Sequence, residues 1–367
     1  MAILVLALAA LLAFANGAND NSKGVATLVG HGAASPRTAL VWAAATTALG
    51  ALVGILASDG LLQAFRAGFV GGGAELSPRF FAAALAGAVT WVIFATRFGL
   101  PVSTTHAILG GLVGAGLTEV GAAQIGWGVL AQKAALPLLA SPLVALALVF
   151  AAARPLAALA RRTESRCLCA IGTLETLAPA GAGEAVVARR GLALVAGDTA
   201  ACAVHSPSAS VTGRGVARAL HWGTSGLVGF ARGWNDTPKI AALALVALPA
   251  GTSTHGAFLL VAAAMALGGL LAGRRVLTTL SERITALPLG ESLAASGVSS
   301  ILVALASWRG LPVSTTHVTT GGIVGAGIAR SAREVRWPVV RDVALSWIVT
   351  LPAAAAVALL AGFALNP

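Results

Sequence analysis

The stretch GLPVSTTHAILGGLVGAGL, residues 99–117, decides the fold because it occurs again as GLPVSTTHVTTGGIVGAGI, residues 310–328. The first eight residues of the two copies are identical. Each copy is preceded by a second shared motif: FANGANDNSKGVA at residues 14–26 corresponds to FARGWNDTPKIAA at residues 230–242. The motifs have the same order in both halves, so the chain is an internal duplication.

The composition indicates an integral membrane protein. Of the 367 residues, 57% are hydrophobic and only 10% are charged. The clearest charge-poor runs are residues 38–58, 80–96, 134–153, 310–329 and 343–367, and further candidates are residues 2–15, 98–118, 220–231, 240–273 and 292–308. A helix of about 20 such residues crosses a hydrocarbon core. We therefore predict an all-α integral membrane protein with about 10–12 membrane segments, including re-entrant or broken helices.

Three regions follow from the duplication. Residues 1–153 form an N-terminal membrane repeat, residues 154–218 a basic linker, and residues 219–367 a C-terminal membrane repeat. Hydropathy alone does not fix the number of crossings in each repeat. An odd number makes the two repeats inverted relative to each other, and this is the arrangement we predict.

The basic residues are explained by a membrane. A net charge of +11 would suggest a nucleic-acid partner in a soluble protein, but here the basic residues lie between apolar runs. Many of them fall in the linker: Arg154, Arg161, Arg162, Arg166, Arg189, Arg190, Arg214 and Arg218. By the positive-inside rule the linker is cytoplasmic, in a multi-pass protein of the inner or plasma membrane. The expected partner is thus the lipid bilayer and not nucleic acid, and a homo-oligomer is left open.

The repeated Gly-Leu-Pro-Val segment predicts a break in a membrane helix, with the proline in the first turn of a new helix. Free N–H groups and the positive end of the helix dipole suit such a turn to anions. One Ser-Thr pair alone would more simply be a packing feature, but two identical copies favour a substrate site. We interpret the histidines that follow, His106 and His317, as packing residues. The candidate hydroxyls are Ser103, Thr104 and Thr105 in the first copy and Ser314, Thr315 and Thr316 in the second.

The Asn-Asp motifs place ionisable side chains where the chain is most apolar, and we expect them to interrupt the helices. Ionisable groups at this depth are costly and usually functional, although an Asp that caps a helix at the membrane interface gives a similar pattern. A lysine follows each Asp by three residues, so the two side chains can pair on one helix face. The two sets are Asn19, Asp20 and Lys23, and Asn235, Asp236 and Lys239.

These paired motifs resemble those of the inorganic phosphate transporter (PiT) family of secondary transporters, and the resemblance covers nearly the whole chain outside the linker. It implies a symporter that imports inorganic phosphate with protons or sodium, by alternating access at a site between two repeats. We expect no enzyme activity and no cofactor other than the coupling ion, H⁺ or Na⁺. The predicted substrate contacts are Asn19, Asn235, Ser103–Thr105 and Ser314–Thr316, and the predicted coupling-ion or proton contacts are Asp20, Asp236, Lys23 and Lys239.

The chain departs from that family at one position in each repeat. The family pattern is Gly-Ala-Asn-Asp-x-Ala-Asn, and Lys23 and Lys239 stand where it has the second Asn. Carboxylates that face a phosphate dianion need a cation between them, since like unit charges about 4 Å apart repel by about 4 kcal/mol at an effective dielectric constant of about 20. We hypothesise that the lysines replace part of the sodium requirement, which makes transport proton-coupled or weakly sodium-dependent.

Three alternatives stay open on the sequence. The first is a sulfate or other oxyanion permease of the same fold. The carboxylates favour phosphate, because monohydrogen phosphate has an O–H to donate to them and sulfate has none. The others are a membrane phosphatase or hydrolase and an ion channel. An enzyme needs different roles at one centre, whereas this chain has two equivalent sets.

The linker holds all three cysteines of the chain. Its segment 184–197, EAVVARRGLALVAG, could form a hairpin or a short helix. The cysteines and one histidine make a loose metal-ligand pattern that is not a standard zinc spacing, so we predict free thiols and no metal site. Disulfides are not expected on the cytoplasmic side. The residues of this pattern are Cys167, Cys169, Cys202 and His205.

Overall fold

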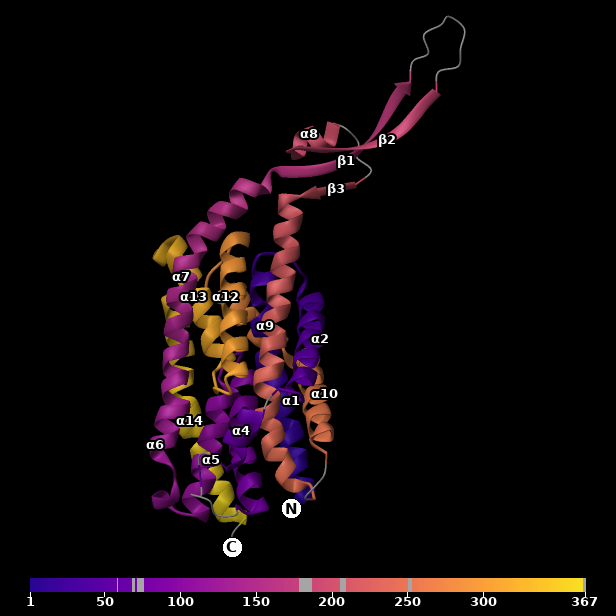
Figure 1. The fold of residues 1–367 in the computed structure, drawn as a ribbon. Coiled ribbons are helices and arrows are strands. Elements are labelled where there is room, and N and C mark those ends of the chain that lie inside the picture. The colour runs from indigo at the N-terminus through magenta and orange to yellow at the C-terminus, as the bar shows by residue number, and fades with distance from the viewer. Residues whose placement is uncertain are drawn as a thin grey trace, which may run out of the picture.

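A computed structural model describes residues 1–57, 59–67, 70, 76–177, 187–204, 209–249 and 253–365. Figure 1 shows a bundle of long helices from which strands extend at one end. The first repeat contains α1 (Ala2–Gly30), α2 (Pro36–Gly54), α3 (Asp59–Ala67), α4 (Pro78–Arg97), α5 (Thr104–Glu119), α6 (Trp127–Val129), a π-helical turn (Leu130–Ala135) and α7 (Leu136–Glu164). The second contains α9 (Gly213–Ala244), α10 (Thr254–Ala272), α11 (Arg274–Thr278), a π-helical turn (Thr279–Arg283), α12 (Leu289–Trp308), α13 (Thr315–Ser331) and α14 (Trp337–Leu365).

Among the described residues, seven helical stretches are long and apolar enough to cross a membrane: α1, α2, α4, Trp127–Glu164, α10, α12 and α14. Three further helices among the described residues have 16 residues or more. α9 has 32 residues and carries several charges. α5 and α13 have 16 and 17 residues, fewer than the about 20 of a full crossing. The predicted all-α membrane fold is therefore confirmed, and α5 and α13 match the predicted broken helices.

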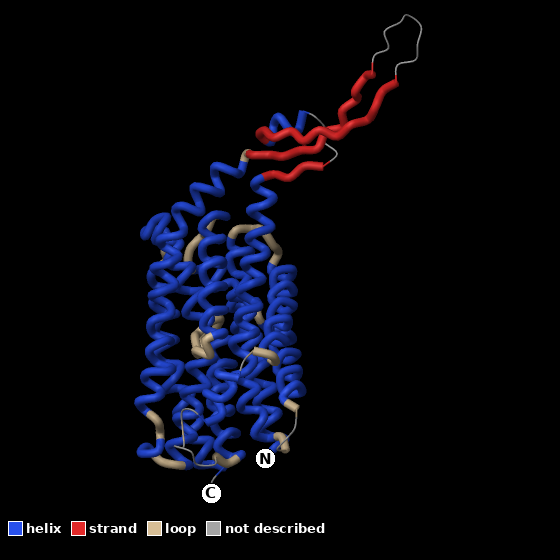
Figure 2. Tube along the Cα trace, viewed as in Figure 1, coloured by secondary structure: helices blue, strands red, loops and turns tan. Residues whose placement is uncertain are grey.

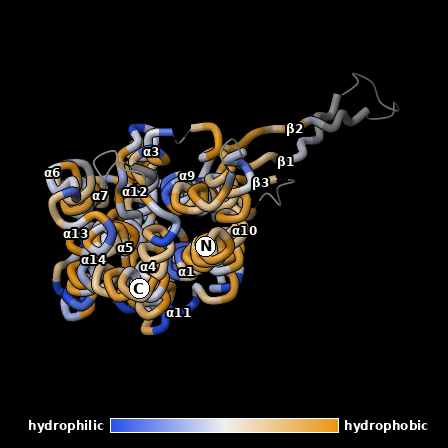
Figure 3. Tube along the Cα trace, turned by 90° about the horizontal axis from the view of Figure 1, so that it is seen from below, coloured by the Kyte–Doolittle hydropathy of each residue, from blue (hydrophilic) through white to orange (hydrophobic). Residues whose placement is uncertain are grey.

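Large apolar side chains cover the outside of the bundle. Leu139, Leu267, Ile348 and Leu360 are each more than half exposed. Figure 3, which looks at the bundle from below, shows hydrophobic segments around its outside. Exposed apolar area of this extent marks a surface that something else covers, and on helices of this length the lipid bilayer covers it.

Both breaks in the membrane helices have the same local cause. α4 and α12 are followed by glycines with positive φ, 68° at Gly99 and 66° at Gly310. The next N–H, of Leu100 or Leu311, donates at 2.9 Å to the carbonyl five residues earlier. Glycine adopts this left-handed conformation without strain, which ends a helix cleanly. Loop segments accordingly lie about halfway along the bundle (Figure 2).

The prolines sit slightly earlier than predicted. α5 begins at Thr104 and α13 at Thr315, so Pro101 and Pro312 lie in the connecting segments and not in the first helical turns. The reason is that the serines of the motif act as N-caps, which fixes the helix starts after them.

The prediction that the Asn-Asp motifs interrupt their helices is wrong. α1 and α9 run through both motifs without a break. Asp20 and Asp236 therefore lie mid-helix, which excludes the interfacial-cap interpretation. Side-chain partners satisfy these charges, so the helices keep their backbone hydrogen bonds.

The short helices pack closely on the long ones through glycines. A Cβ on Gly114 of α5 would come within 2.1 Å of a backbone oxygen of α14, and one on Gly325 of α13 within 2.4 Å of a backbone oxygen of α7. Small residues let membrane helices approach in this way. Each short helix is thus fixed against a long neighbour.

The described part of the linker contains strands as well as a short helix. β1 (Arg166–Leu177), β2 (Val187–Asp198) and β3 (Ala209–Thr212) form an antiparallel sheet of order β2-β1-β3, and α8 (Thr199–Val204) follows β2. The strands agree with the hairpin alternative for segment 184–197. α7 continues to Glu164 and α9 begins at Gly213, so the part between these helices is shorter than residues 154–218.

The structure contradicts the expectation of a linker without disulfides. Cys167 and Cys202 are joined by a disulfide, and Cys169 is a buried free thiol. The sequence could not show this pairing, because it depends on how α8 packs against β1 across 35 residues of chain. His205, the fourth residue of the predicted pattern, lies outside the described residues.

Candidate substrate and ion site

The candidate site lies where α1 and α9 pass the N-terminal ends of α5 and α13. α1 and α9 supply the Asn-Asp-Lys sets, and α5 and α13 supply the hydroxyls. The structure thus brings the predicted residues of both repeats together and buries every one of them: Asn19, Asp20, Lys23, Ser103, Thr104, Thr105, Asn235, Asp236, Lys239, Ser314, Thr315 and Thr316.

The two lysines join the repeats. The Lys23 ammonium donates to the Asp20 carboxylate of its own helix and to the Thr316 hydroxyl of the other repeat. The Lys239 ammonium donates to Asp236 at 3.1 Å and to the Thr105 hydroxyl of the other repeat at 2.9 Å. The predicted Lys–Asp pairing is confirmed, and each pair is tied to the opposite half.

Backbone carbonyls add one equivalent contact to each lysine, and Lys239 in addition donates to the Asn235 side-chain oxygen. Lys23 donates to the Val102 carbonyl at 2.9 Å, and Lys239 donates to the Val313 carbonyl at 3.0 Å. These carbonyls belong to the segments just before the caps of α5 and α13. Irregular backbone with a free carbonyl is tolerated at membrane depth only where a polar partner is near, and the ammonium groups are those partners.

The hydroxyls fall into two kinds. Ser103 and Ser314 accept from the N–H groups of His106 and His317 at 3.2 and 3.3 Å, so they cap the short helices. The threonine hydroxyls instead point into the ionic cluster. Thr104 approaches the Asp20 carboxylate at 3.5 Å. The serines therefore shape the site, while Thr104 donates to Asp20 and Thr105 and Thr316 accept from the lysines.

The two asparagines of the Asn-Asp motifs hold the breaks in place. Asn19 donates to the Thr96 hydroxyl and to the Leu100 carbonyl, both at 2.9 Å, and accepts from the Val102 N–H at 3.1 Å. Asn235 donates to the Ser307 hydroxyl at 2.9 Å. Substrate contact by these amides stays a prediction, because in this structure they bind the ends of α4 and α12 and, in the case of Asn235, the Lys239 ammonium.

Sequence reasoning missed Arg232, a fully buried side chain of α9. Its guanidinium donates to the Asn16 carbonyl oxygen at 2.5 Å, to the Thr47 hydroxyl at 3.0 Å and to Asn21. Its Nε lies 3.7 Å from Asp236 Oδ2. The signal was available in the duplicated motif, where Arg232 and Asn16 occupy equivalent positions two residues after the shared Phe.

Asn16 was missed as well, and it connects the two carboxylates. Its amide donates to Asp20 Oδ2 at 3.1 Å, to Thr104 at 3.0 Å and to Asp236 Oδ2 at 3.4 Å. An amide in this position lets the two acids share a donor without direct contact between them. The carboxylates are thus held close together at the interface between the repeats.

The cluster carries an excess of positive charge. Two lysines and one arginine give three formal positive charges, and two aspartates give two negative ones, all in side chains that are at most 4% exposed. Three minus two leaves +1. Buried charges of one sign need compensation, so this cluster is suited to an anion.

Little empty space adjoins the cluster. Lys23 borders a cavity of about 10 Å³, which is about the volume that one water needs. An anion the size of phosphate can therefore enter only if side chains now bonded to each other separate. The arrangement is that of a closed site.

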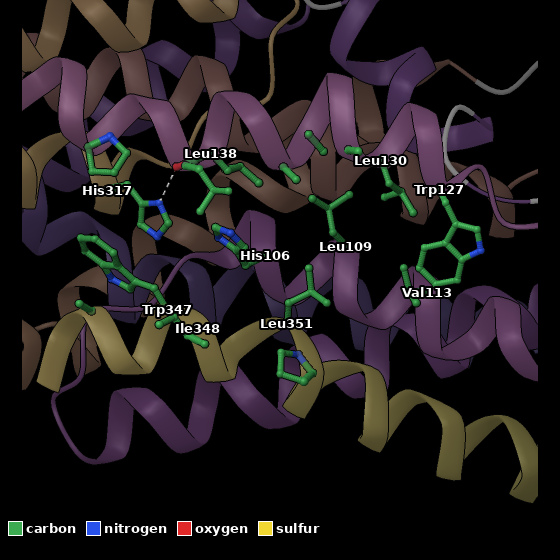
Figure 4. Close-up of a pocket in the computed structure, with 17 residues that line it drawn as sticks. His106, Leu109, Val113, Trp127, Leu130, Leu138, His317, Trp347, Ile348 and Leu351 are labelled. Carbon is green, nitrogen blue, oxygen red and sulfur yellow. Dashed lines mark hydrogen bonds between the residues drawn. The ribbon is translucent and has the colours of Figure 1, made fainter. Parts of the chain in front are cut away.

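A much larger cavity lies beside the site but has a different lining. Figure 4 shows His106, His317 and Trp347 among aliphatic side chains around a space of about 670 Å³. The two imidazoles lie 4.8 Å apart between ring centroids, and His317 Nδ1 lies 3.0 Å from the Leu138 carbonyl oxygen. An apolar lining of this kind is unsuited to a charged oxyanion. The ring contacts fit the predicted packing role of the histidines.

Comparison with known proteins relates nearly the whole chain to phosphate transporters. A family model described as "Phosphate transporter family" matches residues 16–358. A Rhizobium meliloti protein named "Probable low-affinity inorganic phosphate transporter" is 30% identical over 98% of this chain and 95% of its own length. A Mycobacterium tuberculosis protein of the same name is 26% identical over 96% and 74%. A solved structure named "The sodium-dependent phosphate transporter" has the same fold, with a TM-score of 0.77, 23% identity and coverage of 100% of this chain and 98% of its own.

Proposed function

Because this chain belongs to the phosphate transporter family, we propose that it imports inorganic phosphate together with protons, by alternating access at the closed ionic cluster between its repeats. The observation that carries this proposal is the pair of crossed lysines. Each is bonded to an Asp of its own repeat and to a threonine of the other. This arrangement gives the cluster both an anion-binding charge and a mechanical connection between the halves.

Phosphate binding and opening are coupled by the same hydrogen bonds. Phosphate has to accept from the Thr105 and Thr316 hydroxyls. These hydroxyls now donate to the Val313 and Val102 carbonyls and accept from Lys239 and Lys23. When the anion accepts from the lysines, the bonds that cross between the repeats are released. The two repeats can then move relative to each other around the site, as alternating access requires.

Protons balance the charge during this exchange. A lysine that turns to phosphate leaves its aspartate without a cationic partner, and a buried carboxylate without a partner is stabilised by binding a proton. Monohydrogen phosphate brings two negative charges to a cluster of formal charge +1, which gives −1. One proton on Asp20 or Asp236 returns the occupied site to neutrality, so we propose at least one proton per phosphate.

Sodium has no evident place in this cluster. The lysine ammonium groups occupy the positions beside the aspartates, where each already supplies a positive charge. Adding Na⁺ would raise the formal charge of the empty site from +1 to +2. The sodium dependence in the name of the structurally similar transporter therefore does not extend to this chain in our proposal.

The orientation of the bundle also supports the proposal. α4 and α5 lie in the lower part of the bundle in Figure 1, and α12 and α13 lie in the upper part. The equivalent short helices thus enter from opposite ends, as expected for inverted repeats. With the basic linker in the cytoplasm, as the positive-inside rule predicts, the chain is a multi-pass protein of the cell membrane.

Uptake of labelled phosphate into proteoliposomes tests the coupling ion. An inward proton gradient with choline as the only other cation should drive accumulation, and an inward sodium gradient at equal pH should not. The double variant Lys23→Asn with Lys239→Asn restores the family residue in both repeats and should gain sodium dependence. Strict sodium dependence of the unmodified protein would overturn the proposal.

The same vesicles distinguish phosphate from sulfate. An Asp carboxylate can accept the O–H of monohydrogen phosphate, while it only repels sulfate. Unlabelled sulfate at equal concentration should therefore leave phosphate uptake nearly unchanged. Strong competition by sulfate would favour the oxyanion permease.

A further inference from the structure

A cluster of thiols in the linker lies outside the transport site. Cys167 and Cys169 are two residues apart on β1, so both side chains point to the same face of the strand. α8 lies against β1 and β2 in Figure 1 and brings Cys202 to that face. Chain segments 33 residues apart thus meet at one point, since Cys202 follows Cys169 by that distance.

The three sulfur atoms are close together and shielded. All three lie within 4.8 Å of one another. The residues are only 5%, 1% and 3% exposed for Cys167, Cys169 and Cys202. Ile171 and Val195 pack around them. Three buried sulfur ligands converge on one small volume.

A disulfide explains only part of this arrangement. The Cys167–Cys202 bond uses two of the three sulfurs and leaves the Cys169 thiol buried beside it. Had the sheet required only a covalent link to α8, an aliphatic side chain in place of Cys169 would serve as well. The third sulfur indicates a ligand that uses all three.

We propose that the reduced cluster binds one thiophilic d¹⁰ metal ion of the Zn²⁺ type through the three sulfurs of Cys167, Cys169 and Cys202. Thiolates are soft ligands that select such ions. Three protein ligands leave one position of a tetrahedral zinc centre for water or another donor. This site shares no residue with the transport site.

Reduction of the disulfide converts the cluster to the form that binds metal. Two molecules of a cellular thiol reduce the Cys167–Cys202 disulfide, become a disulfide themselves, and leave two cysteine thiols in the protein. Binding of a divalent cation to three thiols then releases three protons, because thiolates are the ligands. The disulfide in the structure is the metal-free, oxidised form of the same cluster.

The cluster is placed where a metal would stiffen the connection between the repeats. β1 continues from α7, and β3 leads into α9. These two helices also meet through an ion pair between Arg214 and Glu164, at 2.5 Å. A metal that links β1 to α8 would fix the sheet that joins them.

Metal analysis of the full-length, tag-free protein tests the proposal. The protein in detergent is reduced without oxygen, incubated with Zn²⁺, separated by gel filtration and analysed by mass spectrometry for zinc. We expect about one zinc per chain, and a loss of at least about tenfold in affinity for Cys169→Ser, in line with the cost of losing a metal-site contact. That variant keeps both disulfide cysteines, so it separates a metal site from a purely disulfide role.

Cobalt gives a second readout that does not depend on a variant folding. Co²⁺ added to the reduced unmodified protein should produce the near-ultraviolet absorption of thiolate-to-cobalt charge transfer, and Zn²⁺ should abolish it. Oxidised protein should show neither effect. Reduced protein that retains no zinc and gives no thiolate–cobalt absorption would overturn the proposal.

Discussion

The Asn-Asp-Lys motifs of α1 and α9 share one design, and only one of the positions at which they differ changes the charge. Both carry an Asp–Lys pair whose lysine reaches a threonine of the other repeat. Two residues after the shared Phe, however, α1 has Asn16 and α9 has Arg232. Asn16 accepts from Arg232 at 2.5 Å, so the two unequal residues face each other across the interface.

The equivalent lysines and the single arginine contribute differently to the cluster. The symmetric lysines tie the repeats together, and a symmetric contact can be released equally from either side. The arginine is the asymmetric addition that turns a neutral set of two ion pairs into a cluster of formal charge +1. In the proposed mechanism, the duplicated lysines provide the contacts that separate, and the charge of Arg232 provides the attraction for an anion.

The largest expected effect comes from removing one carboxylate. Asp236 faces both Lys239 and Arg232, whereas Asp20 is bonded to Lys23 alone among the cations. Asp236→Asn should lower phosphate uptake by about 100-fold or more, because it leaves two buried cations without a carboxylate to balance their charge. Asp20→Asn should have a smaller effect. Uptake in proteoliposomes and thermal unfolding in detergent measure both variants.

The control for this comparison is Asp342→Asn, an exposed acid paired with Arg341. An exposed pair contributes little, so uptake should be unchanged. An Asp20 variant as damaging as the Asp236 variant would mean that Arg232 does not distinguish the two halves.

A smaller effect is expected when the two motifs are made alike. Arg232→Asn gives α9 the residue of α1 and lowers the formal charge of the cluster from +1 to 0. We expect the KM for phosphate to rise about tenfold, the equivalent of about 1.4 kcal/mol, with a smaller change in maximal rate. The dependence of initial uptake on phosphate concentration measures it.

Arg218→Asn removes the same charge from an exposed position of the same helix and is the matched control. It should leave KM unchanged. Equal KM values for the Arg232 variant and the unmodified protein would show that the excess charge does not attract the substrate.

The smallest effects are expected from the threonines that hold the lysines. Thr105→Val and Thr316→Val each remove the hydrogen bond from an ammonium group and the one that the hydroxyl donates to a backbone carbonyl of the other repeat. Each should destabilise the phosphate-free protein by about 1 kcal/mol, and by similar amounts because the two contacts are equivalent. Thermal unfolding without phosphate measures this.

Thr319→Val is the control within α13, since that hydroxyl bonds only to carbonyls of its own helix, at 2.8 Å for the Thr315 carbonyl. It should change stability less than Thr316→Val. A clear difference between Thr105→Val and Thr316→Val would disprove the symmetric connection.

Family membership supports the prediction that this chain is a transporter and not an enzyme. The duplicated motifs in the sequence had led to the same prediction. Two equivalent sets of residues suit a protein whose substrate site is reached from both faces of a membrane, whereas an enzyme needs different roles at one centre. The cysteines were predicted less well. Their spacing, C-x-C followed by a distant Cys, does not show which strand and helix bring the sulfurs together.

The sequence by itself determined the duplication, the membrane fold and the two places where helices break. These features depend on local physics: runs of apolar residues, a glycine that adopts positive φ at residues 99 and 310, and a serine that caps the helix after it. The pairing of each lysine with the Asp three residues before it is local in the same sense.

Only the tertiary structure decided which residues meet across the repeats. Lys23 and Thr316 are separated by 293 residues, and Arg232 and Asn16 by 216. Helix propensity and spacing carry no information about such contacts, since these depend on how whole helices pack. For the same reason the sequence suggested that α1 and α9 break at their charges. In the folded protein each Asp pairs with the lysine of its own helix, a threonine of the other repeat adds a contact to each lysine, and both helices continue.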